Sequence, residues 1–206
     1  MKAGPSLWRG SAPLLLASAS PTRRALLTNA GFDVEMQASG IDERAVEAAA
    51  VHGGLRDVAC RLAREKAFAV SRARPDRLVI GADQTLACEG RLFHKPANRA
   101  AARKQLAALA GRTHVLCSAF AIAEGGAVVK EGVDEARMTM RQVSATALEA
   151  YLDLAGKQAL QSVGAYQVEG PGIHLFERID GDSSTILGLA ILPLLAALRE
   201  MQLLAL

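Results

Sequence analysis

Short runs of hydrophobic residues alternate along the chain with segments in which hydrophobic residues recur every three or four positions. The short runs are typical of buried strands and the longer spacing of amphipathic helices, so the pattern predicts an α/β domain. Strands are expected near residues 14–17, 78–82, 115–123, 137–143 and 173–179, and helices near 21–30, 55–71, 99–110, 145–155 and 187–204. Met138 and Met140 alternate with polar residues, which predicts a strand with one solvated face and antiparallel neighbours, hence a mixed sheet.

The first hydrophobic run, in PLLLASASPTRRALLTNAG (residues 13–31), could end a secretory signal peptide or form a strand that leads into a helix. A signal peptide needs an apolar core of roughly seven to fifteen residues, and only residues 14–17 form an uninterrupted block here. Ser20 is a favourable N-cap, Pro21 suits the first helical position, and Gly31 suits the end of the helix. We therefore interpret the stretch as a strand followed by a helix.

Composition is that of a globular protein of ordinary size. The chain has 206 residues, 50% of them hydrophobic, and a formal net charge of +3, so we expect a sizeable core and no nucleic acid polymer as a partner. The three cysteines have no CxxC spacing, which favours reduced thiols over disulfides or zinc. No hydrophobic stretch is long enough to span a bilayer. We expect a cytoplasmic protein without membrane partners, with residues 1–12 as a flexible N-terminal extension and residues 13–206 as a single two-lobed domain.

The helix predicted after Ser20 brings a positive charge to an anion-binding position. Free backbone N–H groups and the helix dipole favour an anion near Ser18, just before the helix. Arg23 precedes Leu27 by four positions and therefore lies on the hydrophobic face, whereas Arg24 is offset and expected to be solvated. Arg23 could bind an anion there or pair with a carboxylate of the core, and this stretch alone favours neither.

Two further segments place charged residues among hydrophobic ones. Lys66 lies at helical spacing in the hydrophobic stripe of the predicted helix 55–71, so its ammonium either extends to solvent, the commoner outcome, or meets a negative group. The hydrophobic run 78–82 ends at Asp83 and Gln84. Asp83 could cap a turn, but a carboxylate at the carboxyl end of a buried strand also marks the usual ligand crevice of an α/β sheet.

Carboxylates and basic residues together indicate phosphate chemistry. Glu43 follows Asp42 after a glycine turn, and Lys95 precedes a rigid proline in HKP. Carboxylates bind a hard divalent cation through oxygen, and basic groups neutralise phosphate oxygens, which is what metal-assisted attack on a phosphate chain requires. The chain has no GxSxG, GxxxxGK[ST] or GxGxxG motif, so those nucleophile and nucleotide-binding classes are excluded.

A series of motifs runs in order from about residue 14 to the last predicted helix: LASASPTRR, GIDER, LAREKA, IGADQT, HKP, GAYQVEG and LFERIDGDSSTILGL. With these motifs the chain resembles the Maf family of septum-formation-inhibitor-like nucleotide pyrophosphatases. The resemblance implies a mixed twisted sheet with flanking helices and two lobes around a cleft, similar to inosine-triphosphate pyrophosphatases. It also implies hydrolysis of a nucleoside triphosphate to the monophosphate and pyrophosphate with Mg²⁺ or Mn²⁺, and it leaves room for a homodimer.

The family pattern also implies roles for single residues. It puts Ser18 and Arg23 on the phosphates, and Lys66 and Lys95 on the phosphate charge. Glu43 and Asp83 are implied at the metal and the attacking water. Asp83 would act either as the general base or as a metal ligand that orients the water, and the sequence does not decide between these.

Three departures from the commonest family pattern occur, one of them at residues 188–191, where many members read GLPL and this chain reads GLAI, a change expected to affect packing only. Thr22 stands where many members have a second basic residue, so the phosphate clamp rests more heavily on Arg23. Gln84 and Glu169 stand where many members have Thr and Gln, which resembles the subgroup that acts on 7-methyl-GTP. The resemblance leaves two alternatives open: a dTTP or UTP pyrophosphatase, and a non-catalytic nucleotide-binding regulator of septum formation.

Overall fold

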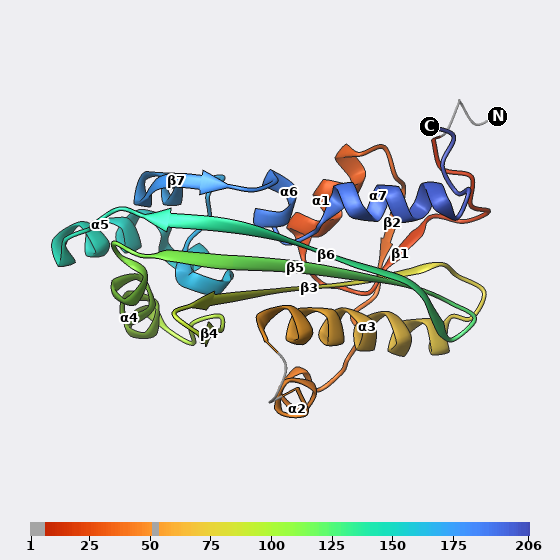
Figure 1. The fold of residues 1–206 in the computed structure, drawn as a ribbon, viewed down its shortest axis with the longest axis horizontal. Helices are drawn as coiled ribbons and strands as arrows, with labels where there is room; N and C mark the ends of the chain where they lie inside the picture. The colour runs from red at the N-terminus through yellow and green to blue at the C-terminus, as the bar shows by residue number, and fades with distance from the viewer. Residues whose placement is uncertain (1–6, 51–53) are drawn as a thin grey trace. The chain divides into compact units, whose positions relative to one another are not determined.

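The computed structural model describes residues 7–50 and 54–206. The chain divides into two compact units: the first comprises Met1–Gln84, Cys117–Asp134 and Asp182–Leu206, and the second comprises Thr85–Leu116 and Glu135–Gly181. Three strands, β3 (Val79–Cys88), β5 (Thr113–Glu124) and β6 (Ala127–Met140), contribute residues to both units. The strand order is β2-β1-β3-β5-β6-β7, with β4 paired to β3. The predicted α/β class, with a mixed sheet and flanking helices, is therefore confirmed (Figure 1).

In the first unit, the short strand β1 (Leu14–Leu16) lies between β2 (Val34–Met36) and β3 and runs parallel to both. Helices α1 (Pro21–Asn29) and α7 (Ile191–Glu200) lie over one face of these strands, and α3 (Leu55–Ala73) lies over the other (Figure 1). Two shorter helices, α2 (Glu43–Ala48) and α6 (Ser183–Ile186), complete this unit. Ser20 caps α1 through its side chain and Pro21 begins the helix, as predicted.

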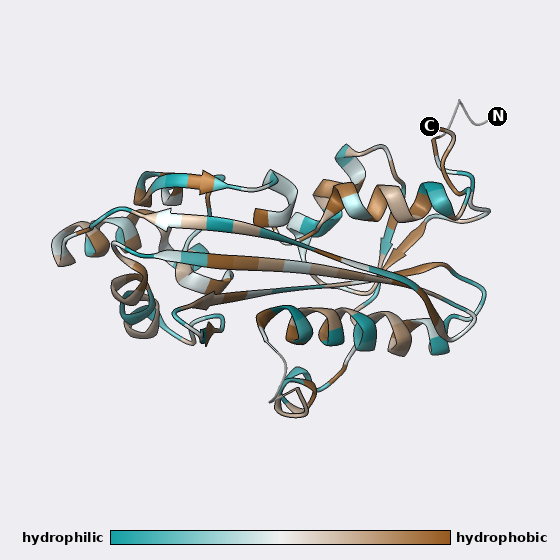
Figure 2. Cartoon of the chain, viewed as in Figure 1, coloured by the Kyte–Doolittle hydropathy of each residue, from teal (hydrophilic) through white to brown (hydrophobic). Residues whose placement is uncertain are grey.

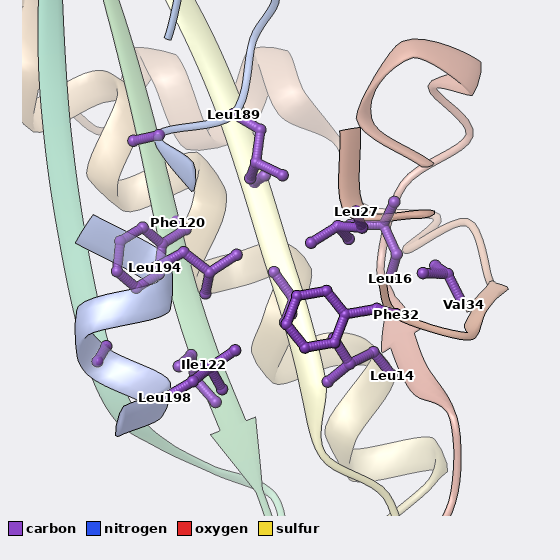
Figure 3. Packing of buried hydrophobic residues seen from close by; sticks show 14 residues of the cluster. Leu14, Leu16, Leu27, Phe32, Val34, Phe120, Ile122, Leu189, Leu194 and Leu198 are labelled. Atoms are coloured by element: carbon purple, nitrogen blue, oxygen red, sulfur yellow. The ribbon is translucent and has the colours of Figure 1, made fainter. Parts of the chain in front are cut away.

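The two faces of the first unit carry different side chains because successive strand residues point to opposite faces. Phe120 and Ile122 of β5 join a cluster with residues of β1, α1 and α7, including Leu27 and Leu194 (Figure 3). The intervening β5 residues join α3 in a second cluster composed almost entirely of alanines, together with Cys117. Figure 2 shows hydrophobic and hydrophilic residues interleaved along α3, as expected for an amphipathic helix. Small side chains let α3 approach the strands closely.

The second unit contains residues 85–88 of β3, 113–116 of β5 and 135–140 of β6, together with several shorter elements. Its remaining strands are β4 (Arg91–Phe93) and β7 (Phe176–Asp180), its helices are α4 (Arg99–Leu109) and α5 (Ala145–Ala155), and its 3₁₀ turns are η1 (Gly156–Leu160), η2 (Val163–Ala165) and η3 (Pro171–Leu175). β6 pairs antiparallel with β7. Met138 and Met140 are buried while Arg137 is exposed, so the predicted one-faced antiparallel strand is confirmed.

Two of the predicted boundaries are wrong in ways that affect the site. The strand predicted to end at Ala82 continues to Cys88, so Asp83 and Gln84 lie inside β3 and not at its end. The strand continues because β3 also pairs with β4, which holds residues 86–88 in the sheet. The last helix begins at Ile191 instead of residue 187. Gly188 has a φ of +100°, a left-handed conformation that no α-helix contains.

The segment before β1, predicted to be a flexible extension, makes contacts with other parts of the first unit where the structure describes it. Trp8 packs edge-on against Phe32, with ring centroids 6.0 Å apart, and forms a β-bridge with Leu204. This segment therefore contacts Phe32, which follows α1, and Leu204 near the end of the chain. The rest of the predicted extension, residues 1–6, lies outside the described residues. Within the described ranges, no helix has the length and apolar character needed to cross a membrane.

Candidate active site

Lys66 on α3 lies between two carboxylates. Its Nζ is 2.6 Å from Asp83 Oδ1 on β3 and 2.7 Å from Glu43 Oε1 at the start of α2. The side chains of Lys66 and Asp83 are only 8% and 10% exposed, whereas the side chain of Glu43 is 57% exposed. Of the two outcomes considered for Lys66, the meeting with a negative group is therefore confirmed. A buried ammonium between two carboxylates is a local charge arrangement of the kind that binding sites use.

Gly81 brings α3 close enough for this contact. It lies two residues before Asp83 and so faces α3 on the same side of β3. A Cβ atom at Gly81 would lie 2.8 Å from Ala67 Cβ and 2.5 Å from Ala67 N, closer than packed atoms tolerate. Sequence reasoning did not single out Gly81, although a glycine inside a hydrophobic strand is a known signal for close backbone approach.

Only one of the two acidic residues in GIDER joins the site. Asp42 is the N-cap of α2, and its Oδ1 accepts a hydrogen bond from Ala45 N at 3.1 Å. Glu43 is the first residue of α2 and is directed to Lys66. The two residues differ because the N-cap carboxylate of Asp42 is bonded to the helix backbone, whereas the side chain of Glu43 can contact other groups.

Beyond the end of β1, the side chain of Arg23 binds the next carbonyl along the edge of β3. Along this edge, Leu78 O accepts from Leu15 N and Ile80 O from Ala17 N. The next carbonyl in the series, Ala82 O, accepts instead from Arg23 Nη1 at 2.9 Å. The guanidinium therefore lies beyond the carboxyl end of β1, which is the usual ligand crevice of a parallel sheet. The strand end that marks the site is thus that of β1, and not that of β3 as the sequence suggested.

The other contacts of Arg23 are also with neutral oxygens. Its Nε donates to Gly188 O at 2.7 Å, and Nη1 lies 3.4 Å from Ser18 Oγ, which itself accepts from Ser20 N at 3.1 Å. Burial lowers the pKa of the Arg23 guanidinium, and the charges of Asp83 and Glu43 act in the opposite direction. The prediction of an inward Arg23 beside an exposed Arg24 is confirmed. The direct partners of Arg23 are neutral oxygens that do not cancel its charge, so the guanidinium can attract an anion.

Gln84 lies on the opposite face of β3 from Asp83, because the two residues are adjacent in a strand. Its Nε2 donates to Thr185 O at 2.9 Å and Ile186 O at 3.0 Å, and lies 3.2 Å from Ser118 Oγ. These contacts dock α6 against the strand. A contact between Gln84 and a nucleobase would therefore have to use the carbonyl oxygen of its side chain.

Lys95 and Glu169 belong to the second unit. Lys95 follows β4 in an exposed loop, and Glu169 is exposed in the turn that precedes η3. The first unit thus brings together Ser18 with Arg23, and Lys66 with Glu43 and Asp83, without involving either of them. Their roles at the phosphate and the base stay predictions.

The carboxylates of Glu43 and Asp83 fit a divalent cation by their chemistry. In the part of the chain that the structure describes, no three His, Cys, Asp or Glu side chains gather into a complete metal site. Two carboxylates do converge, since both contact the same ammonium group. Mg²⁺ is commonly held by one or two carboxylates, with substrate phosphates and water as the remaining ligands. Glu43 and Asp83 are thus the two carboxylates that the first unit could contribute to such a cation.

Comparison with known proteins agrees with the motifs. Residues 13–201 match the family model described as "Maf-like protein". The chain belongs to the Maf family. This Maf protein is 58% identical to a nucleoside triphosphate pyrophosphatase of Bradyrhizobium diazoefficiens, over 97% of this chain and 98% of that protein. It is 50% identical to a 7-methyl-GTP pyrophosphatase of Mesorhizobium japonicum, over 91% and 96% of the two chains.

Among solved structures, a nucleoside-triphosphatase / dITP/XTP pyrophosphatase from Mycobacterium abscessus aligns with 91% of this chain and 96% of its own. The sequence identity is 17% and the TM-score 0.38, which is too low to support an argument about this Maf protein. The family assignment rests on the sequence matches.

Proposed function

We propose that this Maf protein is a nucleoside triphosphate pyrophosphatase that prefers 7-methyl-GTP. The observation that carries the pyrophosphatase activity is the charge arrangement in the first unit. Arg23 is held by neutral oxygens beyond the end of β1, and the carboxylates of Glu43 and Asp83 are held by Lys66. A triphosphate would provide a negatively charged partner for Arg23. A cation bound to the triphosphate would be coordinated by the two carboxylates.

The triphosphate would bind at the start of α1. Ser18 Oγ, the backbone N–H of Thr22 in the first turn of α1, and the Arg23 guanidinium would provide donors to phosphate oxygens. Pro21 has no N–H, and the backbone N–H of Arg23 already donates to Ser20 Oγ. Lys66, and Lys95 from the second unit, would neutralise charge that develops on the pyrophosphate as it leaves. A divalent cation, Mg²⁺ or Mn²⁺, would polarise the phosphoryl group and lower the pKa of the attacking water.

Asp83 is the group that we propose to accept the proton of this water. The water oxygen forms a bond to the α-phosphorus, the bond from that phosphorus to the bridging oxygen breaks, and pyrophosphate leaves with the bonding electrons. Asp83 is suited to this because it is buried and its carboxylate is oriented by Lys66. Glu43, which is more exposed, would serve as the second cation ligand.

The experiment for the activity is a panel of nucleoside triphosphates incubated with the purified protein and Mg²⁺ or Mn²⁺. We expect release of pyrophosphate, without release of orthophosphate, and loss of the reaction when a chelator removes the cation. Nucleotide binding without any pyrophosphate release would instead favour the non-catalytic regulator of septum formation. The alternative of a dTTP or UTP pyrophosphatase would appear as a preference for those two nucleotides.

The choice of 7-methyl-GTP depends on Glu169. A guanine base offers N–H donors, which a carboxylate accepts better than an amide does, and methylation of N7 gives the base a positive charge. Glu169 is exposed and precedes η3, so its carboxylate is accessible. The 50% identity to a protein named 7-methyl-GTP pyrophosphatase supports the same choice.

Glu169→Gln tests this assignment. We expect the preference for 7-methyl-GTP over GTP, measured as a ratio of kcat/KM values, to shrink by roughly 1–3 kcal/mol, the scale of a charged hydrogen bond. The matched control is Glu177→Gln, which removes an exposed carboxylate of β7 in the same unit and should leave the ratio unchanged. An unchanged ratio in Glu169→Gln would reject the role of Glu169 and leave the pyrophosphatase activity standing.

A further inference from the structure

Thr185 is the centre of a buried polar network in the first unit. It is fully buried, and its Oγ1 donates to Asp134 Oδ2 at 2.7 Å. Its carbonyl oxygen accepts from Ser118 Oγ at 2.7 Å and from Gln84 Nε2 at 2.9 Å. The partners come from β3, β5 and β6, so three strands fix the position of one residue of α6.

This network continues to the guanidinium of Arg23. Gly188 N donates to Thr185 O at 3.1 Å, which closes a tight turn between the two residues. Gly188, which ends the turn, has a left-handed φ of +100°, a conformation that favours glycine. The carbonyl of Gly188 is the acceptor for Arg23 Nε at 2.7 Å. Because the turn is short, the place of this carbonyl is set by the place of Thr185.

We propose that Thr185 is a positioning residue for Arg23, acting through the carbonyl of Gly188. The Thr185–Asp134 hydrogen bond orients the turn so that Gly188 O engages Nε, while Ala82 O of β3 engages Nη1 from the sheet. The guanidinium is then held in one orientation, with its remaining N–H donors available to phosphate oxygens. Orienting this donor group in advance saves the ordering cost that a flexible arginine would incur when the ligand binds. The inference rests on the proposed function of Arg23 as a phosphate-binding group.

A matched pair of variants separates positioning from simple packing. Thr185→Val keeps the shape of the side chain and removes the hydroxyl, whereas Thr185→Ser keeps the hydroxyl. We expect Thr185→Val to lower kcat/KM for the preferred triphosphate about tenfold, mainly by raising KM, and Thr185→Ser to stay within about twofold of the wild type. Ile122→Val, which slightly destabilises the adjacent core without touching this network, should keep kcat/KM.

A double-mutant cycle with Arg23→Ala shows whether Thr185 acts through the arginine. In the Arg23→Ala protein, Thr185→Val should cause no further loss of kcat/KM, because there is no guanidinium left to orient. Equal losses in the presence and absence of Arg23, or an unchanged KM in Thr185→Val, would overturn the inference. If Thr185→Val does not fold, Ser118→Ala, which removes a different donor to the same carbonyl, takes its place in the cycle.

The same measurements distinguish failure of this inference from failure of the proposed function. Arg23→Ala alone should lose activity while Arg24→Ala, which changes the exposed neighbour, should not. Wild-type kinetics in Arg23→Ala would reject the phosphate-binding role itself. Loss of activity in Arg23→Ala with additive effects of Thr185→Val would reject only the positioning role.

Discussion

The two units bury polar side chains in opposite ways. The first unit keeps charges inside, with the ammonium of Lys66 against the carboxylate of Asp83. The second unit buries a neutral pair, in which His114 Nε2 and Tyr166 Oη are 2.6 Å apart. Burial lowers the pKa of His114 to about 4 and raises the pKa of Tyr166, so both groups are uncharged at neutral pH.

The surroundings of the two groups explain the difference. The His114–Tyr166 pair is packed among aromatic rings, with the Tyr166 and Phe176 centroids 4.7 Å apart, and His114 Nδ1 has no hydrogen-bond partner in the described part of the chain. Such a site favours neutral forms, and the pair joins β5 to the segment that follows η2. In the first unit, each buried charge is retained by an opposite charge or by several oxygens. The convergence of Lys66, Glu43 and Asp83 beside Arg23 is the arrangement that a charged ligand requires, whereas a neutral pair among aromatic rings is typical of packing.

The strongest test of this contrast is Asp83→Asn, which removes a buried charge and preserves the shape of the side chain. We expect a loss of turnover of at least ~100-fold, because the variant can neither accept the proton nor bind the cation well. Pyrophosphate release measures the loss, and chemical denaturation should show that the variant remains folded. Turnover within a few-fold of the wild type would refute the assignment of Asp83.

The second prediction concerns the buried His114 of the second unit, which should make the stability of the protein depend on pH. The folded-state pKa of His114, about 4, lies below its ordinary value of 6.5, so between these values the unfolded chain binds more protons than the folded protein. The free energy of unfolding therefore falls as pH drops from about 6.5 to about 4, by at most about 3 kcal/mol from this group.

The measurement is urea unfolding at pH 7 and pH 4.5 for the wild type and for His114→Phe/Tyr166→Phe. The double variant removes both polar partners together, so that neither is left buried and unpaired. We expect the wild type to lose more stability than the double variant over this interval. The same loss in both proteins would mean that His114 does not titrate abnormally.

The smallest expected effect concerns the approach of α3 to β3. Gly81→Ala should lower the free energy of unfolding by roughly 1–3 kcal/mol, because the added methyl group collides with the backbone of α3. We also expect kcat/KM to fall, since displacement of α3 separates Lys66 from Asp83. Gly54→Ala is the control at the N-cap of the same helix, where a Cβ meets none of the described atoms within 4 Å. If Gly81→Ala were destabilised but fully active, the close approach would serve packing alone.

Local sequence determined those parts of the fold that depend on neighbouring residues. The strand at Leu14 and the helix after Ser20 follow from a short hydrophobic run, a capping serine and a proline, all within a few positions. The alternation of Met138 and Met140 determined a strand with one buried face. The ordered motifs were sufficient to recognise the family, and they include the residues that the first unit brings together.

Only the tertiary structure decided how these residues meet. Periodicity shows that a residue is in a strand but not where the neighbouring strand stops, so it could not reveal that Arg23 occupies the edge of β3 beyond β1. It also placed Asp83 and Gln84 together at a strand end, whereas inside a continuous strand the pleat sends them to opposite faces. The contacts of Arg23 with Gly188 and of Thr185 with Asp134 join segments far apart in the chain. Such pairings depend on the packing of whole elements, which no local pattern encodes.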